Sequence, residues 1–161
     1  ASMNPAFQNH RLRAILVGKA QKLRKSDVLS GIAKQAVADE VAVNLSDDIL
    51  VNGRMDKLAG YFDGDDYLQH NPAVADGLSG LGSALAAMAK AGVSMKYERV
   101  HKTLGEGNFV LVISEGQFAG KHVAFYDLFR VQDNKIAEHW DTIEPIPPQS
   151  EWKNTNGKFG F

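Results

Sequence analysis

Apolar residues in the first half of the chain recur every three or four positions, the spacing of helices with one buried face. Ser26-Asp27 is a suitable N-cap for the first helix, whose pattern continues toward Val51. Asn52-Gly53 interrupts it, and a second, short helix follows over 55–62. A third apolar stripe precedes Gly92, which is placed to close its helix. The apolar positions of these three helices are Val28, Ile32, Ala36 and Val37, then Met55, Leu58, Ala59 and Phe62, then Leu81, Ala84, Leu85 and Met88.

From Val93 onward the period changes to two, and β-branched and aromatic residues predominate. Short turn segments at 105–108 and 133–135 predict tight hairpin connections, whereas 115–121 reads as a longer loop with two glycines. Helices followed by a meander of strands predict an α+β fold, with N-terminal helices packed on a mainly antiparallel sheet. The strands are expected near 94–104, 109–115, 122–132 and 136–144.

The chain length allows one ordinary domain, which we place at 26–148 between a basic extension (1–25) and a C-terminal tail (149–161). The extension reads as a solvated segment or as an arm on a partner subunit, and the acidic body argues against nucleic-acid binding. The absence of cysteine excludes disulfides, thiolate metal sites and a cysteine nucleophile. The apolar stretch at 14–18 is too short to span a membrane, so we expect a soluble, cytoplasmic protein.

Three segments together resemble the SnoaL-like polyketide cyclases of the nuclear transport factor 2-like superfamily. They are Tyr67-Leu68-Gln69-His70-Asn71-Pro72 followed by Asp76-Gly77, then Phe125-Tyr126-Asp127-Leu128-Phe129-Arg130, then Lys135-Ile136-Ala137-Glu138-His139-Trp140-Asp141. The resemblance implies a cone in which helices close one side of a curved sheet around a pocket. It does not imply one reaction, because the superfamily includes cyclases, ketosteroid isomerases, epoxide hydrolases and proteins that only bind.

Carboxylates on the last two strands are the most informative candidates for chemistry. If 133–135 forms a three-residue loop, Gln132 pairs with Ile136, and in that register Asp127 faces Asp141. Alternation then places both acids on one largely apolar face, together with Phe125, Phe129, His139 and Ile143. Opposed carboxylates repel each other when both are ionised. Such a pair can supply a base and an acid for removing a proton beside a carbonyl and returning one to oxygen.

The resemblance assigns roles to the same residues. In the similar cyclases an aspartate near the end of the last strand is the acid/base, and Asp141 is similar to it by its place in the His-Trp-Asp segment. A histidine on the neighbouring strand helps to shape the cyclase site, and here Asp127 stands in its place. A purely structural reading remains open, in which Asp141 binds backbone or Trp donors and Asp127 pairs with Arg99 or Arg130.

His70 is a third catalytic candidate, because Pro72 restricts the conformation of Asn71 and so aims this loop at the mouth of the cone. His70 could bind a substrate oxygen or tie the loop to a backbone carbonyl. No pair of histidines has the spacing of a metal site, so we predict no metal and no cofactor. The residues expected to bind substrate are Asn71, His139, Phe125, Phe129, Tyr97, Phe62 and Met88.

The sequence thus predicts an enzyme that acts on a small, largely apolar carbonyl compound by aldol-type cyclisation or isomerisation. A non-catalytic binding or assembly domain of the same fold is the first alternative, and an epoxide hydrolase is the second. Tyr126, Leu128 and Trp140 share the opposite sheet face, where three large apolar side chains need a cover. Either the basic extension and the C-terminal tail fold back over them, or a second copy of the chain packs there. We expect the second copy, in a homodimer.

Overall fold

A computed structural model describes residues 25–161. The predicted basic extension, 1–25, lies outside the described residues except for Lys25. The chain forms two units, Ala1–Ala33 and Lys34–Phe161, which meet within the first described helix.

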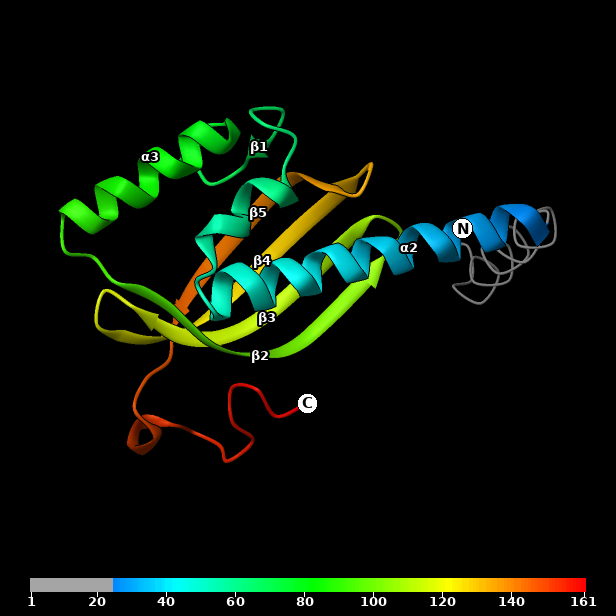
Figure 1. Ribbon diagram of the computed structural model, residues 1–161. Coiled ribbons are helices and arrows are strands. Elements are labelled where there is room, and N and C mark those ends of the chain that lie inside the picture. Colours follow the sequence, from blue (N-terminus) through cyan, green and yellow to red (C-terminus); the bar gives the residue numbers. More distant parts are fainter. Residues whose placement is uncertain (1–24) are drawn as a thin grey trace, which may run out of the picture. The chain divides into compact units, whose positions relative to one another are not determined.

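Lys34–Phe161 combines helices with one five-stranded sheet in the order β1-β5-β4-β3-β2. Neighbouring strands are antiparallel except for β1 and β5, which are parallel. The four long strands form a curved sheet, and η1 with the adjoining part of α2 lies over one face of it (Figure 1). This arrangement confirms the predicted α+β fold. The elements are α2 (Lys25–Leu45), η1 (Ser46–Val51), η2 (Met55–Tyr61), β1 (Leu68–Gln69), α3 (Gly77–Lys90), β2 (Met95–Glu106), β3 (Phe109–Phe118), β4 (Lys121–Gln132), β5 (Lys135–Pro145) and η3 (Gln149–Glu151).

The buried stripe of α2 differs from the one predicted. Ala38, Ala42 and Leu45 are buried at helical spacing, whereas Val37 is exposed. The predicted stripe used the apolar residues nearest the N-cap, but the sheet contacts the C-terminal half of the helix. A π-helical turn, η1, then continues the helix to Val51, as the pattern predicted.

The second helix is a 3₁₀-helix, and this changes which residues it buries. Leu58 and Tyr61 pack on the core at the three-residue period of a 3₁₀-helix, and Phe62 follows them as a buried residue. Met55, which the α-helical pattern placed on the buried face, is exposed.

Gly92 closes α3 as the sequence predicts. It has φ +70°, its N–H donates to the Ala89 carbonyl, and the Val93 N–H donates to the Met88 carbonyl. These two bonds form a Schellman motif, in which the left-handed residue is most often glycine.

Two of the predicted connections between strands are wrong in detail. The segment 115–121 is a tight turn at Ala119-Gly120 that joins two longer strands, and it is not a loop. The last hairpin has a two-residue turn, Asp133-Asn134, with φ values of 50° and 62°. Gln132 therefore pairs with Lys135 instead of Ile136.

A bulge restores the predicted register of this hairpin. Val131 pairs with Ile136 and Arg130 with Glu138, so Ala137 is the extra residue on β5. The shortened turn and the bulge offset each other. Between the Arg130–Glu138 pair and the Val123–Pro145 pair, every residue of β4 therefore has the partner that the longer loop would have given it.

The inner sheet face carries the main core, in which α2, η1 and the segment around Tyr67 cover Val110, Val112 and Phe129. The outer face carries Tyr126, Leu128 and Trp140, all partly buried. The Arg130 Nε donates to Glu138 between neighbouring strands of this face.

The C-terminal tail packs on part of the outer face. Phe159 stacks on His101 with 4.0 Å between ring centroids. Lys158 lies over the ring of Tyr126 and pairs with Glu144. Within 25–161, no helix is long and apolar enough to cross a membrane.

Gly116 permits the close approach of β2 and β3 where β2 carries a bulge between Tyr97 and Arg99. A Cβ on Gly116 would lie 2.0 Å from the Lys96 carbonyl oxygen. We predict that Gly116→Ala destabilises the fold by about 1–3 kcal/mol, because backbone has to move to accept the methyl group. Urea unfolding measures this change.

Gly82→Ala is the matched control, since nothing lies within 4 Å of its added Cβ and it sits inside α3. It should stabilise the protein by up to about 1 kcal/mol through helix propensity. Equal free energies of unfolding for the two variants would contradict the role assigned to Gly116.

Candidate functional site

The hairpin of β4 and β5 brings two carboxylates together on the inner sheet face. Asp127 is the partner of Asp141, and Phe129 is the partner of His139, which confirms the predicted register. Asp127 lies deepest, with 1% of its surface exposed, while Asp141 is only partly buried. One acid therefore belongs to the core, and the other reaches toward solvent.

Asp127, on β4, is held by donors from two other strands, β2 and β5. Its Oδ1 accepts hydrogen bonds from the hydroxyl of Tyr97 (3.2 Å) and from Nε2 of His139 (3.1 Å). Its Oδ2 is buried without a partner among the described residues. Asp127 thus pairs with neither Arg99 nor Arg130, the two partners considered for a purely structural acid.

Aromatic rings fix the two donors of Asp127. Tyr97 stacks on Phe125 with 4.0 Å between ring centroids, and Phe129 stacks on the His139 ring at 4.8 Å. Burial, followed by the charge of Asp127, raises the pKa of Tyr97 well above its ordinary value. Tyr97 therefore keeps its proton at neutral pH and serves as a donor.

Asp141 is held by the loop after β1. Nδ2 of Asn71 donates to its Oδ2 (3.1 Å), while its Oδ1 is buried with no partner in the described part of the chain. The loop is shaped by Asn71 itself, whose Oδ1 accepts the N–H of Ala73. The acid pair therefore presents two unpartnered carboxylate oxygens, one from each strand.

Tyr67 and Gln69 extend the cluster, and sequence reasoning missed both of them. Nε2 of Gln69 donates to the Tyr67 hydroxyl (2.9 Å) and to Nδ1 of His139 (3.2 Å). Burial, then the charges of Asp141 and Asp127, raise the pKa of Tyr67. Its hydroxyl is a protonated donor beside the acid pair.

His70 lies elsewhere, which corrects the expectation that it points into the cone. Its ring stacks on Trp140 with centroids 4.1 Å apart, and its Nε2 is 2.9 Å from Oε2 of Glu138. Both contacts belong to the outer face. The sequence predicts a loop here, but Leu68–Gln69 is a short strand, and strand alternation turns Gln69 inward and His70 outward.

The predicted apolar lining is placed only in part. Phe62 is buried and meets the Tyr67 ring edge-on at 4.8 Å, which brings it next to the polar cluster. Met88 is partly buried near the end of α3, and none of the contacts described above includes it. Within residues 25–161, no group of three His, Asp or Glu side chains is arranged to hold a metal ion.

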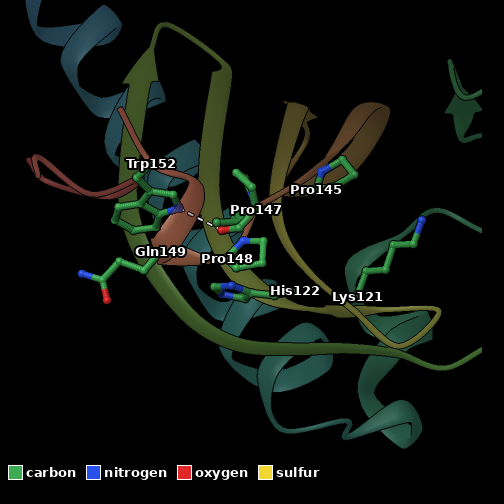
Figure 2. A pocket seen from close by; sticks show the side chains of 8 residues that line it. Lys121, His122, Pro145, Pro147, Pro148, Gln149 and Trp152 are labelled. Carbon is green, nitrogen blue, oxygen red and sulfur yellow. Dashed lines mark hydrogen bonds between the residues drawn. The ribbon is translucent and has the colours of Figure 1, made fainter. Parts of the chain in front are cut away.

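A pocket of about 520 Å³ lies away from this cluster, between the ends of β4 and β5 and the C-terminal segment. Figure 2 shows the indole Nε1 of Trp152 donating to the Pro147 carbonyl (2.8 Å) beside it. Neither acid lines this pocket, and its one histidine, His122, bonds Glu115. Its lining residues are Lys121, His122, Pro145, Ile146, Pro147, Pro148, Gln149 and Trp152.

A model of the SnoaL-like domain matches residues 44–139, more than half of the chain; this range includes Asp127 and His139 and ends two residues before Asp141. The chain belongs to the SnoaL-like domain family. No curated protein matches the sequence. The family match confirms the resemblance drawn from the three sequence segments.

Solved structures agree on the fold of this SnoaL-like protein. A putative ketosteroid isomerase from Kribbella flavida matches with a TM-score of 0.57 and 14% identity, over 78% of this chain and 95% of that one. A protein of unknown function with a cystatin-like fold from Xanthomonas campestris matches with a TM-score of 0.53 and 22% identity, over 66% of this chain and 89% of that one. TsrD from Streptomyces laurentii matches with a TM-score of 0.51 and 20% identity, over 68% of this chain and 89% of that one. At these identities the likeness concerns the fold alone.

Glu138 binds His70 and so connects the loop that carries Asn71 to the outer face of the sheet. The hydrogen bond from His70, and then Arg130, lowers the Glu138 pKa below its ordinary value of 4.5. A carboxylate with a lowered pKa in the folded state stabilises the fold above pH 4.5, and the stabilisation is lost as the pH falls through that lowered pKa. We predict that Glu138→Gln is less stable than wild type by up to about 1 kcal/mol at neutral pH.

This difference should shrink toward zero in acid. Urea unfolding at about pH 7 and about pH 3 measures it. Glu98→Gln, the same change at an exposed glutamate of β2, is the control and should show little effect at either pH. If the loss of unfolding free energy in Glu138→Gln is the same in acid as at neutral pH, the ionic role of Glu138 is contradicted.

Proposed function

We propose that this SnoaL-like protein is a cofactor-independent enzyme that moves a proton beside a carbonyl group in a small, largely apolar compound. Either isomerisation or an aldol-type cyclisation would follow from that step. One observation carries the proposal: Asp127 and Asp141 face each other across two strands, and each has a buried oxygen without a protein partner. Unpartnered buried acceptors are costly, and they concentrate at functional sites.

Asp141 is the general base in this proposal, because it is the more exposed of the two acids. Its carboxylate takes the proton from the carbon next to the carbonyl, and the electron pair of that C–H bond moves to give an enolate. In an isomerisation Asp141 returns the proton to another carbon. In an aldol step the enolate carbon bonds to a second carbonyl, whose oxygen receives the proton.

Tyr67 supports the negative charge that develops on the substrate oxygen. Its hydroxyl accepts a hydrogen bond from Gln69, and its raised pKa keeps its own proton available for donation. Asp127 is the cross-strand partner of Asp141 in this proposal. Asn71 orients Asp141 by binding its Oδ2. Substrate contact with Phe125, Phe129 and Tyr97 follows from their place on the same face.

Non-catalytic binding is the second candidate, and a different observation favours it. The rings of Phe62 and Tyr67, and those of Tyr97 and Phe125, pack on one another as in a filled core. The open pocket lined by Pro147 and Trp152 holds none of the acids. A domain that binds a ligand or a partner at that pocket would use the polar cluster only for stability. Epoxide hydrolysis, with paired acids activating water and protonating oxygen, is a third possibility.

Asp141→Asn distinguishes an enzyme from a binding domain. The asparagine oxygen still accepts from Asn71, so the loop keeps its anchor, while the base is lost. We predict that the wild type accelerates both the exchange of α-hydrogens of 2-tetralone for deuterium and the isomerisation of a β,γ-unsaturated ketosteroid, and that the variant loses about 10²–10⁴-fold of the rate. Mass spectrometry and ultraviolet absorbance measure the two reactions.

Asp133→Asn is the matched control, because Asp133 lies exposed in the last turn and asparagine also adopts its φ of 50°. It should keep the wild-type rate. Full activity in Asp141→Asn, with the control equally active, would overturn the catalytic role of Asp141 and favour the binding domain.

We also propose a homodimer through the outer face, with Tyr126, Leu128 and Trp140 in the contact and a cytoplasmic location. The tail covers Tyr126 through Lys158, and His70 covers one side of Trp140. Beside them Phe109 is 39% exposed, and its ring centroid lies 6.0 Å from that of Trp140. The apolar surface at this end of the face is therefore still open to a second copy.

Trp140→Glu tests the dimer. We predict that the wild type has the mass of two chains by light scattering at micromolar concentration and that the variant has the mass of one, because a charge in an apolar contact is not solvated. Ala86→Glu adds the same charge at an exposed position of α3, outside the sheet, and should stay dimeric. A monomeric wild type, or a dimer that tolerates Trp140→Glu, would show that the face is covered from within the chain.

A further inference from the structure

The side-chain amide of Gln69 has only one orientation that satisfies its surroundings. The backbone N–H of Asn71 donates to its Oε1 (3.0 Å), and an N–H can be accepted only by the oxygen of the amide. The NH₂ group must therefore face the other way, toward the Tyr67 hydroxyl and Nδ1 of His139. A turn of the backbone thus sets the direction of a side chain inside the polar cluster.

This orientation determines where the imidazole of His139 carries its proton. Because Gln69 donates to Nδ1 at 3.2 Å, Nδ1 has to be an acceptor and cannot carry hydrogen. The proton then lies on Nε2, which faces Oδ1 of Asp127 at 3.1 Å and donates to it. Both ring nitrogens are committed to protein partners.

The neighbouring acids would favour a different state of the ring. A carboxylate in contact with a histidine favours the imidazolium, and Asp127 faces Nε2 while Asp141 lies opposite Asp127 on the same face. The other titratable groups of the cluster, Tyr67 and Tyr97, are protonated and neutral. An imidazolium would point its Nδ1–H at the NH₂ of Gln69, donor against donor. If the Gln69 amide were flipped, its NH₂ group would instead face the backbone N–H of Asn71, again donor against donor.

We infer that Gln69 is a positioning residue that holds His139 in the neutral form with its proton on Nε2. The inference rests on the proposed function in one respect: it concerns the same acid pair. With His139 neutral, Asp127 is a hydrogen-bonded carboxylate and not half of an ion pair, so the cluster keeps its negative charge. Neither ring nitrogen is free to take a proton from a substrate, which leaves proton removal to the carboxylates.

The nitrogen resonances of His139 test this directly in the free protein, with no substrate. Two-bond ¹H–¹⁵N spectra of ¹⁵N-histidine-labelled protein distinguish protonated from unprotonated ring nitrogens, and His139→Gln assigns the signals. We expect the wild type at about pH 7 to show Nδ1 unprotonated and Nε2 protonated. A ring with hydrogen on Nδ1, alone or together with Nε2, would overturn the inference.

Gln69→Glu is the decisive variant because it keeps the shape of the side chain. One carboxylate oxygen still accepts the N–H of Asn71, and the other now accepts from Nδ1, so both ring nitrogens should be protonated at about pH 7. The Nδ1 resonance then shifts from the unprotonated to the protonated range. Leu68→Glu places the same charge on the same strand at a side chain that is 49% exposed, and it should keep the wild-type pattern.

The outcomes separate this inference from the proposed function. An unchanged ring in Gln69→Glu, or a ring altered equally by Leu68→Glu, would overturn the role of Gln69 whatever the enzyme does. If the expected spectra are found while Asp141→Asn keeps full activity, Gln69 still sets the state of His139 and only the catalytic proposal fails. The wild-type spectrum alone is decisive if Gln69→Glu does not fold.

Discussion

The buried carboxylate of Asp127 is the constraint on which the rest of this fold depends. A charged group placed against a hydrophobic core costs several kcal/mol unless donors replace the water that it loses. Here Tyr97 comes from β2 and His139 from β5, so the acid on β4 ties three strands together across the sheet. Stacked aromatic rings hold both Tyr97 and His139 in place. His139 also contacts the side chain of Gln69 on β1.

The same constraint links the sheet edge to the site. Strand β1 has only two residues, yet its parallel pairing with β5 decides that Gln69 turns inward and His70 outward. The inward side chain completes the contacts of His139, while the outward ring rests on Trp140 and Glu138. A two-residue strand therefore joins the polar cluster on one face to the candidate dimer surface on the other.

The close approach of β2 and β3 and the register of the last hairpin depend on small backbone features. Gly116 lets β3 approach the bulged part of β2, and the extra residue Ala137 shifts β5 back into line after a turn of only two residues. Without the second feature His139 and Asp141 would lose Phe129 and Asp127 as their partners. The acid pair is thus a product of hairpin geometry as much as of residue choice.

The sequence by itself determined the order of the main helices and the four long strands, the α+β class, the family and the pairing of Asp127 with Asp141. The family rests on the resemblance of three segments. The other features follow from periodicity and alternation, which act over a few residues and leave a clear pattern in the chain. Tertiary structure alone decided the rest. The Asp133-Asn134 turn and the bulge at Ala137 cancel in the register, so the pattern does not reveal them. Gln69 and Tyr67 belong to the polar cluster and His70 does not, because Leu68–Gln69 pairs as a strand with residues about 70 positions later in the chain. A two-residue strand is too short to show alternation in the sequence.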